Sequence, residues 1–293
     1  MLVSRLPSGQ LSAALPWLTT SGHRIVTVDG DALTLRGINL PDLGDPAASL
    51  DTPLDWPLNV ARLRVPAPIP VQLDVLDALI ARHADRGAYT LLLVDAPATA
   101  SDGADEPADS VDVTLLLALA ARYANEPAVL FELAPDAQAE TTDSSADLLW
   151  QRAARRWRSL LAPLRALHPR AFVFAAGLNR GHDLSGFPLR SGDASIPNLV
   201  YSAALHPGAL AQLGAFARRQ PLFVANWQAD ASAGLLNEAT LGVLAAAGIS
   251  WAASDADSRS GWLRNARGVL EPTPSGRWVQ RALAISTMWD AAR

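Results

Sequence analysis

The sequence predicts an α/β protein, a single (β/α)8 TIM barrel with a short N-terminal β-hairpin flap. Two observations favour this fold: eight short, nearly continuous apolar runs recur along the chain, and helical patterns lie between most of them. Continuous apolar runs are typical of strands that are covered on both faces in a parallel sheet. Strand and helix alternate over about 250 residues, which is the usual length of such a barrel.

The chain before the barrel contains a hairpin signal. The β-rich runs 23–28 and 32–40 lie on either side of Asp29-Gly30-Asp31. A short turn with a central glycine between two such runs is typical of a β-hairpin. We therefore expect residues 1–33 to form an N-terminal extension and flap that leads into the first barrel strand.

The expected barrel elements follow in order. The strands are TLRGINL (34–40), VARLRVP (60–66), YTLLLVDA (89–96), AVLFELA (128–134), AFVFAAG (171–177), LVYSAAL (199–205), PLFVANW (221–227) and GISWAAS (248–254). The helices, with apolar residues spaced by three and four, are 71–87, 112–124, 145–167, 208–220, 231–248 and 275–293. The first and fifth connections, 46–56 and 178–197, predict short helices or loops. We find no internal repeat and no long linker, so residues 1–293 are expected to form one domain.

Composition excludes several classes of function. The net charge is −5 and the basic residues are scattered along the chain, so nucleic acid is not an expected partner. The chain has no cysteine, which excludes disulfides and thiolate metal sites. No His-Glu-x-x-His, phosphate-binding loop or dinucleotide motif is present, so no cofactor is implied.

The sequence also bears on location. The first 18 residues lack an uninterrupted apolar segment followed by a small-residue cleavage site, and no window reaches the length of a transmembrane span. We therefore expect a cytoplasmic protein without a transmembrane segment. Export by a non-classical route stays open as an alternative.

Two acidic segments flank the strand 128–134. Asn125-Glu126-Pro127 precedes the strand and Asp136 follows it. In a barrel, functional side chains project from the carboxyl ends of the strands and from the loops after them. The Asn-Glu-Pro triplet is therefore expected to be a helix-to-strand connector, and chemistry from this segment would fall to Asp136.

Several ordered motifs resemble glycoside hydrolase family 5, the cellulase-like retaining enzymes. They are Leu35 to Leu40, Asn59 to Leu63, Arg122-Tyr123 through Glu132-Leu133, Tyr201-Ser202, Pro221 to Trp227 and Gly248 to Trp251. The resemblance covers nearly the whole chain. It implies the same barrel, and a reaction that uses two glutamates about 5 Å apart.

Neither glutamate of the family is present at its expected position. The acid/base position reads Pro135-Asp136-Ala137, and the nucleophile position at the end of the seventh strand reads Asn226. Asp is one methylene shorter than Glu, and Asn cannot act as a carboxylate nucleophile. Supporting polar positions of the family fall at Pro97, Ala204 and His206, and the tryptophan of the eighth strand falls near Ser254, whereas Arg62 is retained.

Each candidate residue also has a structural interpretation. Asp136 could cap its loop, and Glu132 is expected to pair with Arg62 or Arg64, because an unpaired interior charge is costly. Asn226 could satisfy backbone groups of its own loop. The acidic residues Asp255 and Asp257 could replace a missing carboxylate or form an exposed turn.

Aromatic residues could provide a carbohydrate-facing wall. Trp227, Trp251 and Trp262 lie on, or just after, the last two barrel strands, where core packing is the alternative role. With Arg62 and His206, we assign Trp227 and Trp262 as candidate substrate-binding residues.

These features predict a catalytically degenerate family-5-like barrel, a pseudoenzyme that acts as a glycan-binding or structural component. Its partner would be a glycan or another protein of a larger assembly. The alternative is an active O-glycosyl hydrolase on a β-linked polysaccharide or oligosaccharide. It would use Asp136 with a displaced carboxylate such as Asp230 or Asp255, or Asn226 in substrate-assisted cleavage. No metal site is expected.

Overall fold

The structure of the 293-residue chain is a computed structural model. The structure describes residues 15–43, 55–66, 73–95, 113–133, 146–188, 190–191, 194–206, 208–229, 234–255, 262–266 and 269–291.

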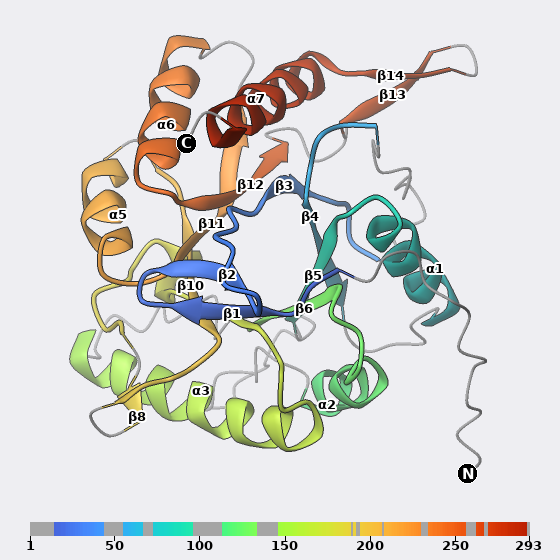
Figure 1. The fold of residues 1–293 in the computed structure, drawn as a ribbon. Coiled ribbons are helices and arrows are strands. Elements are labelled where there is room, and N and C mark those ends of the chain that lie inside the picture. Colours follow the sequence, from blue (N-terminus) through green and yellow to red (C-terminus); the bar gives the residue numbers. More distant parts are fainter. Residues whose placement is uncertain are drawn as a thin grey trace, which may run out of the picture.

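Eight parallel strands close into a barrel, as the sequence predicts (Figure 1). In order around the barrel they are β3 (Arg36–Asn39), β4 (Val60–Pro66), β5 (Tyr89–Asp95), β6 (Val129–Leu133), β7 (Val173–Ala176), β10 (Leu199–Ala204), β11 (Leu222–Ala229) and β12 (Ser250–Asp255). The ring closes where β12 pairs with β3. Because all strands are parallel, their carboxyl ends lie at one end of the barrel.

Helices surround the barrel on the outside (Figure 1). They are α1 (Leu73–Ala84), α2 (Val113–Arg122), α3 (Ala146–Leu167), α4 (Leu178–Gly181), α5 (Leu210–Ala217), α6 (Gly234–Ala246) and α7 (Pro274–Ala291). The six helices expected from apolar spacing correspond to all of these except α4. In the weak fifth connection, α4 is followed by a small antiparallel pair, β8 (Arg190–Ser191) with β9 (Ala194–Ser195). Of the weak first connection, the described residues 55–56 form a turn and bend rather than a helix.

Alternation along the strands separates two cores. On β4, Ala61, Leu63 and Val65 belong to the large apolar cluster between strands and helices, whereas Val60 belongs to the smaller cluster. The smaller cluster therefore fills the barrel itself. Its aromatic members include Phe174 and Phe223, whose rings meet edge to face with centroids 5.1 Å apart.

The N-terminal hairpin forms one turn earlier than predicted. It pairs β1 (Leu18–Ser21) with β2 (Arg24–Thr27), and Gly22 turns the chain at a positive φ of 59°. The predicted turn at Asp29–Asp31 also exists, with Gly30 at φ 94°, but beyond it the chain makes only an isolated bridge between Val26 and Ala32. The sequence signal therefore identified the second of two consecutive turns.

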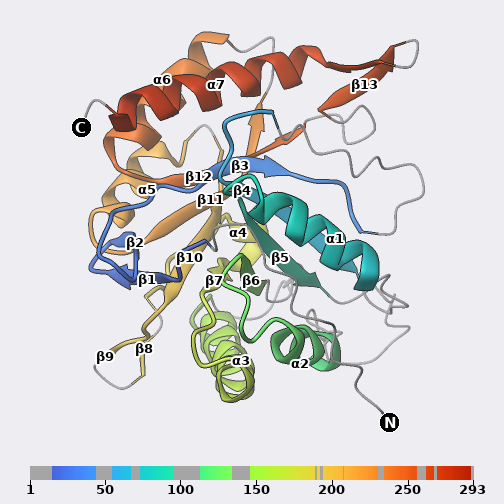
Figure 2. The same ribbon diagram turned by 45° about the vertical axis from the view of Figure 1, so that its right-hand side comes forward.

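This hairpin covers the amino-terminal end of the barrel (Figures 1 and 2). Leu18 and Ile25 belong to the apolar cluster that fills the barrel. The hydroxyl of Tyr89, the first residue of β5, donates a hydrogen bond to the carbonyl of Pro16 at 2.8 Å. The segment expected to be a flap thus closes the end of the barrel that lies opposite the carboxyl ends of the strands.

A second hairpin was not predicted from the sequence. It pairs β13 (Leu263–Ala266) with β14 (Val269–Pro272), between the last barrel strand and α7. The short run LRNARGVLEP mixes charged and apolar residues, so it lacks the continuous apolar signal of the barrel strands. In Figure 2 the hairpin projects on the side opposite β1 and β2.

Among the described residues, no helix combines the length and the apolar composition that crossing a membrane requires.

Candidate functional site at the carboxyl end of the barrel

The strand β6 carries the most deeply buried acidic side chain of the described residues. Val129, Phe131 and Leu133 face the helices, while Leu130 faces the barrel interior. The two-residue period therefore directs Glu132 into the barrel, where its exposure is 1%. An isolated carboxylate at such a position would be costly, so its partners decide whether it is tolerated.

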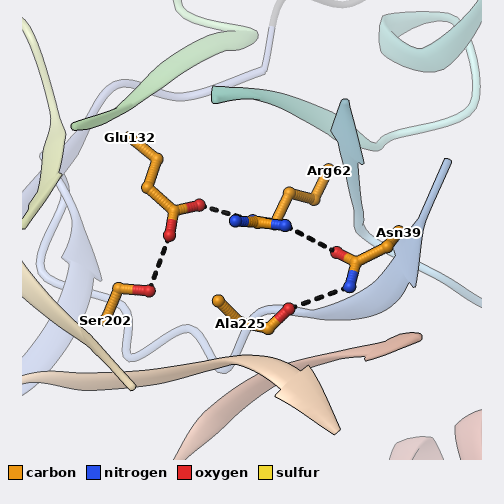
Figure 3. A network of polar contacts seen from close by, with 5 residues as sticks. All are labelled: Asn39, Arg62, Glu132, Ser202 and Ala225. Carbon is orange, nitrogen blue, oxygen red and sulfur yellow. Dashed lines mark hydrogen bonds and ion pairs between the residues drawn. The ribbon is translucent and has the colours of Figure 1, made fainter. Parts of the chain in front are cut away.

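Both carboxylate oxygens of Glu132 have partners (Figure 3). Nε of Arg62, on β4, donates to Oε2 at 2.5 Å, and Oγ of Ser202, on β10, donates to Oε1 at 2.7 Å. Charge-assisted hydrogen bonds of this kind compensate the loss of hydration. The expected pairing of Glu132 with a β4 arginine is confirmed, and the partner is Arg62.

Asn39 extends this network to the other side of the barrel. Nη1 of Arg62 donates to Oδ1 of Asn39 at 3.4 Å, and Nδ2 of Asn39 donates to the carbonyl of Ala225 at 2.9 Å (Figure 3). Side chains from β3, β4, β6 and β10 and a carbonyl of β11 are thus connected. We call Asn39, Arg62, Glu132 and Ser202 the inner polar network.

Asn39 and Ser202 are members of the network that were not predicted as site residues from the sequence. Both occur in the motifs that carry the family resemblance, and both are polar residues on otherwise apolar strands. Such interruptions were the available signal. The contact of Asn39 with Arg62 and that of Ser202 with Glu132 could not be read from the sequence, because the partners are far apart along the chain.

The other arginine of β4 contacts a different acid. Nη1 of Arg64 lies 2.9 Å from Oδ2 of Asp42, and both side chains are partly exposed. This pair follows the inner polar network along β4 toward the carboxyl end. Together the two pairs place two positive and two negative charges there, so their formal charges cancel.

Asn226 lies in the carboxyl-terminal half of β11, beyond an irregularity in the strand. The register with β10 shifts between Ala203 and Ala204, so that Asn226 stands opposite Ala204. Its carbonyl accepts a hydrogen bond from the amide of Leu205 at 3.0 Å, and its side chain is exposed. Oδ1 of Asn226 accepts a hydrogen bond from Oγ of Ser254 on β12.

This contact joins two positions at which the resemblance implies other residues. Asn226 stands at the nucleophile position and Ser254 near the position of an aromatic residue that would contact sugar. Both replacements are small and uncharged. The Asn226 side chain thus bonds a side chain of the neighbouring strand β12, whereas the structural interpretation expected it to bond backbone groups of its own loop.

The candidate tryptophans are buried. Trp227 is 2% exposed and packs edge to face on Trp251 and Trp278, with ring centroids 5.1 and 5.3 Å away. Because the strand irregularity precedes it, the Trp227 indole faces α7 and has no face that a sugar could contact. The expected carbohydrate-facing wall does not include Trp227 or Trp251 in this structure.

Trp262 lies closer to the inner polar network. It is 5% exposed, and its Nε1 donates to the carbonyl of Asn39 at 2.8 Å. The indole therefore supports the carboxyl end of β3. A sugar-binding role for Trp262 stays a prediction.

His206 follows β10 and is exposed. Its ring lies 5.5 Å from that of His182, measured between centroids. It has no contact with the inner polar network among the described residues.

Of the remaining acidic candidates, Asp255 and Glu126 lie within the described residues. Asp136, Asp230 and Asp257 lie outside the described residues. The backbone of Asp255 ends β12, beside Ala229 of β11. The Asn125–Pro127 triplet lies between α2 and β6, where Oε1 of Glu126 accepts a hydrogen bond from the amide of Ala128 at 3.1 Å. This confirms that the triplet is a connector before a strand.

Comparisons with known proteins address the fold. No protein-family model matches the sequence, and no curated protein matches it by sequence. Among solved structures, a β-glucanase from Saccharophagus degradans is similar with a TM-score of 0.69 at 17% identity, covering 97% of this chain and 98% of that chain. A GH5 cellulase from an Icelandic hot spring isolate has a TM-score of 0.68 at 17% identity, covering 94% of each chain.

The similarity extends to a protein named as a cellulose synthase subunit. Cellulose synthase subunit Z from Clostridioides difficile is similar with a TM-score of 0.62 at 14% identity, covering 86% of this chain and 99% of that chain. The comparisons agree with the resemblance found in the sequence motifs. The chain thus has the barrel fold of glycoside hydrolase family 5 cellulases.

Proposed function

We propose that this chain is a catalytically degenerate barrel of the family-5 type, which binds a glycan or serves as a structural component of an assembly. The observation that carries the proposal is the side chain of Asn226. It occupies the strand end at which the resemblance implies the nucleophile, and it accepts a hydrogen bond from Ser254.

A retaining glycosidase needs a carboxylate that attacks the anomeric carbon and a second carboxyl group that protonates the leaving oxygen. The amide of Asn226 is neutral and cannot form the glycosyl ester. At the acid position Asp136 is shorter than Glu, and a displacement of about 1 Å can reduce the rate about a hundredfold. Both changes oppose hydrolysis by the family mechanism.

Glu132 does not replace the missing nucleophile. It is 1% exposed, and both of its oxygens accept hydrogen bonds, from Arg62 and Ser202. A nucleophile needs an oxygen that can approach the substrate. The arrangement supports a structural role for Glu132, in which it neutralises Arg62 and ties three strands together.

Two other acids on this side of the barrel are also engaged. Asp42 pairs with Arg64. Oδ2 of Asp183 accepts from Nε1 of Trp150 at 2.9 Å, and Oδ1 accepts from the amide of Ser185 at 2.8 Å. These contacts favour structural roles for the acidic side chains that the structure describes here.

The choice of partner follows from the similar structures. They include a β-glucanase and a cellulase, which favours a β-linked glycan, and a cellulose synthase subunit, which favours a place in a larger assembly. On the chain itself, Asn226 and Ser254 offer neutral hydrogen-bonding groups of the kind that meet sugar hydroxyls. Arg62, His206 and Trp262 are the further residues we assign to glycan contact.

The test is hydrolysis of aryl β-glycosides and of β-glucan and mannan oligosaccharides, followed by calorimetric titration with the same oligosaccharides. The proteins are wild type, Asp136→Ala, Asn226→Ala and, as a matched control, Asp29→Ala in the hairpin at the opposite end. We expect no turnover by wild type. If oligosaccharide binds, Asn226→Ala should weaken binding whereas Asp29→Ala should not.

Turnover by wild type that is lost in Asp136→Ala but kept in Asp29→Ala would overturn the proposal and identify the acid. Absence of both turnover and oligosaccharide binding would leave the assembly role, which predicts a stable complex with another component. A variant with both Asp136→Glu and Asn226→Glu tests whether restoring the two glutamates of the family is sufficient for turnover. Turnover by this variant alone would locate the loss of activity at these two positions.

An active enzyme with a non-standard carboxylate pair is the alternative, and one observation favours it. β12 continues to Asp255, directly after Ser254, so its backbone lies next to the strand end that carries Asn226. With Asp136 as acid, a retaining reaction needs a carboxyl separation of about 5 Å and an inverting one about 6.5 to 9.5 Å. Loss of turnover in both Asp136→Ala and Asp255→Asn, with product stereochemistry followed by NMR, would establish this alternative.

A further inference from the structure

Two exposed histidines come together beside the carboxyl end of β10. His182 caps the carboxyl end of α4, and His206 follows β10. Their ring centroids are 5.5 Å apart and the ring planes make an angle of 50°. Within the described ranges, neither ring has another side-chain partner.

The separation is suitable for a shared metal ion. Imidazole nitrogen binds Zn²⁺ at about 2.0 to 2.1 Å, so two imidazoles on one ion at tetrahedral to trigonal angles have ring centres about 5 to 5.5 Å apart. Imidazole is also a good ligand for Cu²⁺ and Ni²⁺. The observed spacing lies in this range without any movement of the backbone.

The segments that carry the two rings are held against each other. The amide of Gly177 donates to the carbonyl of Ser202 at 2.9 Å, which fixes the start of α4 on β10. Gly181 has φ 87°, and a Cβ added there would lie 2.7 Å from the backbone nitrogen of Ala204. Only glycine allows this close approach. Gly181 directly precedes His182, and Ala204 lies two residues before His206, so the contact brings the two histidines together.

The residue after His182 reinforces the arrangement. Asp183 donates its amide proton to the carbonyl of Leu178 at 3.0 Å, and both of its carboxylate oxygens are hydrogen-bonded, to Trp150 and to the amide of Ser185. Asp183 therefore anchors the turn and is not available as a ligand. A pair of ligands on a preorganised frame binds a metal more tightly than the same pair on mobile segments.

We propose that His182 and His206 together bind one divalent transition-metal ion of the zinc, copper or nickel type, with water at the other coordination positions. Among the described residues, no cluster of three or more potential metal ligands exists, so this part of the chain supplies the two histidines as ligands. The site lies next to the strand end of Asn226, whose carbonyl accepts from the amide of Leu205. His206 is also one of the residues that we assign to glycan contact, so the two proposals share one side chain, but the metal site is tested by metal binding alone.

The composition of the chain limits the number of competing metal ligands. There is no cysteine and there are five histidines. His83 and His168 are fully buried, and His23 is an exposed histidine on the hairpin at the opposite end of the barrel. His23→Ala is therefore the matched control for His182→Ala and His206→Ala.

The experiment is calorimetric titration of the untagged, chelator-treated protein with ZnCl₂, with a parallel Cu²⁺ electron paramagnetic resonance spectrum to detect nitrogen ligands. We expect one ion per chain and a loss of affinity of at least about tenfold in each of His182→Ala and His206→Ala. His23→Ala should bind like wild type. Circular dichroism and thermal unfolding without metal establish that each variant is folded.

Three results would overturn the site. They are no Zn²⁺ binding by wild type, equal binding by wild type and the His182→Ala and His206→Ala double variant, and loss of binding in His23→Ala, which would assign the ion to the hairpin instead. None of these results depends on turnover or on oligosaccharide binding, so failure of the metal site and failure of the proposed function are distinguishable.

Discussion

Arg62 and Glu132 are 70 positions apart in the sequence, yet Nε of the arginine lies 2.5 Å from Oε2 of the glutamate inside the barrel. The glutamate is 1% exposed and the arginine side chain 16%. A charge that is removed from water at this depth depends on its partner. The stability of the barrel therefore depends on an ion pair that lies within the candidate site.

Removing one member of this pair should be costly. Arg62→Leu leaves the Glu132 carboxylate with the Ser202 hydroxyl alone, and we expect the free energy of unfolding to fall by about 3 to 5 kcal/mol. Replacing both residues, Arg62→Leu with Glu132→Leu, should recover part of this loss because no charge remains unpaired. Urea unfolding measures all variants. If the free energy of unfolding of Arg62→Leu stays within about 1 kcal/mol of wild type, the ion pair does not stabilise the barrel as proposed.

His83 predicts a loss of stability in acid. Burial, followed by the nearby charge of Arg82, lowers the pKa of His83 from 6.5 to about 4. The unfolded chain therefore takes up this proton at a higher pH than the folded chain. The contribution of neutral His83 to the free energy of unfolding is intact above pH 6.5 and decreases as the pH falls from 6.5 to 4. The total decrease is roughly 3 kcal/mol.

The measurement is the free energy of urea unfolding at pH 7.5 and pH 5. His83→Gln should show a smaller decrease than wild type, since it carries no titrating group. His23→Gln, which alters an exposed histidine, should decrease as wild type does. His168 is also buried and burial lowers its pKa, so a residual decrease in His83→Gln is expected. Equal pH dependence in His83→Gln and wild type would contradict the prediction.

Trp227 should act as a core residue and not as a sugar platform. Its ring packs between Trp251 and Trp278, so Trp227→Ala should lower the free energy of unfolding by about 3 to 5 kcal/mol. Trp227→Phe, which keeps an aromatic ring, should be closer to wild type and leave any oligosaccharide binding unchanged. Unfolding and titration calorimetry test the two statements separately. A binding defect in a stable Trp227→Phe variant would restore the sugar-contact role.

Gly181 should be intolerant of any side chain. In Gly181→Ala the new Cβ would meet the backbone of Ala204, and the positive φ of 87° adds strain. We expect lower thermal stability and weaker Zn²⁺ binding, because α4 would be displaced from β10. Gly214→Ala is the matched control: it lies inside α5, and a Cβ there would have no heavy atom within 4 Å. That change should leave stability equal or slightly higher. Unchanged Zn²⁺ affinity in Gly181→Ala would show that its close approach does not position the histidines.

The pairing of Glu132 and the place of Asn226 illustrate what sequence reasoning can and cannot reach. The two-residue alternation on β6 places Glu132 inside the barrel, and a buried charge implies a cationic partner. The choice between Arg62 and Arg64, and the bond from Ser202, needed the register of β4, β6 and β10. A register between distant strands depends on how the whole barrel closes, which short-range patterns do not encode.

The tryptophans and histidines show the same division. Trp227 follows Asn226 at a strand end, and its position in the sequence favoured the open side of the barrel. The irregular register between β10 and β11 turns it toward α7 instead. The meeting of His182 with His206 likewise depends on the short helix α4, whose place on β10 is set by a backbone contact at Gly181.

By itself, the sequence determined the class of fold and the order of the barrel strands, and through its family resemblance it predicts that Asp136 and Asn226 stand at the two catalytic carboxylate positions. These follow from local apolar patterns and from residue identity, which are properties of short segments. Only the tertiary structure decided which side chains meet: Arg62 with Glu132, Asn226 with Ser254 and His182 with His206. Such contacts arise from strand register and backbone packing between segments that are distant in the chain, so they exist only when the barrel has closed.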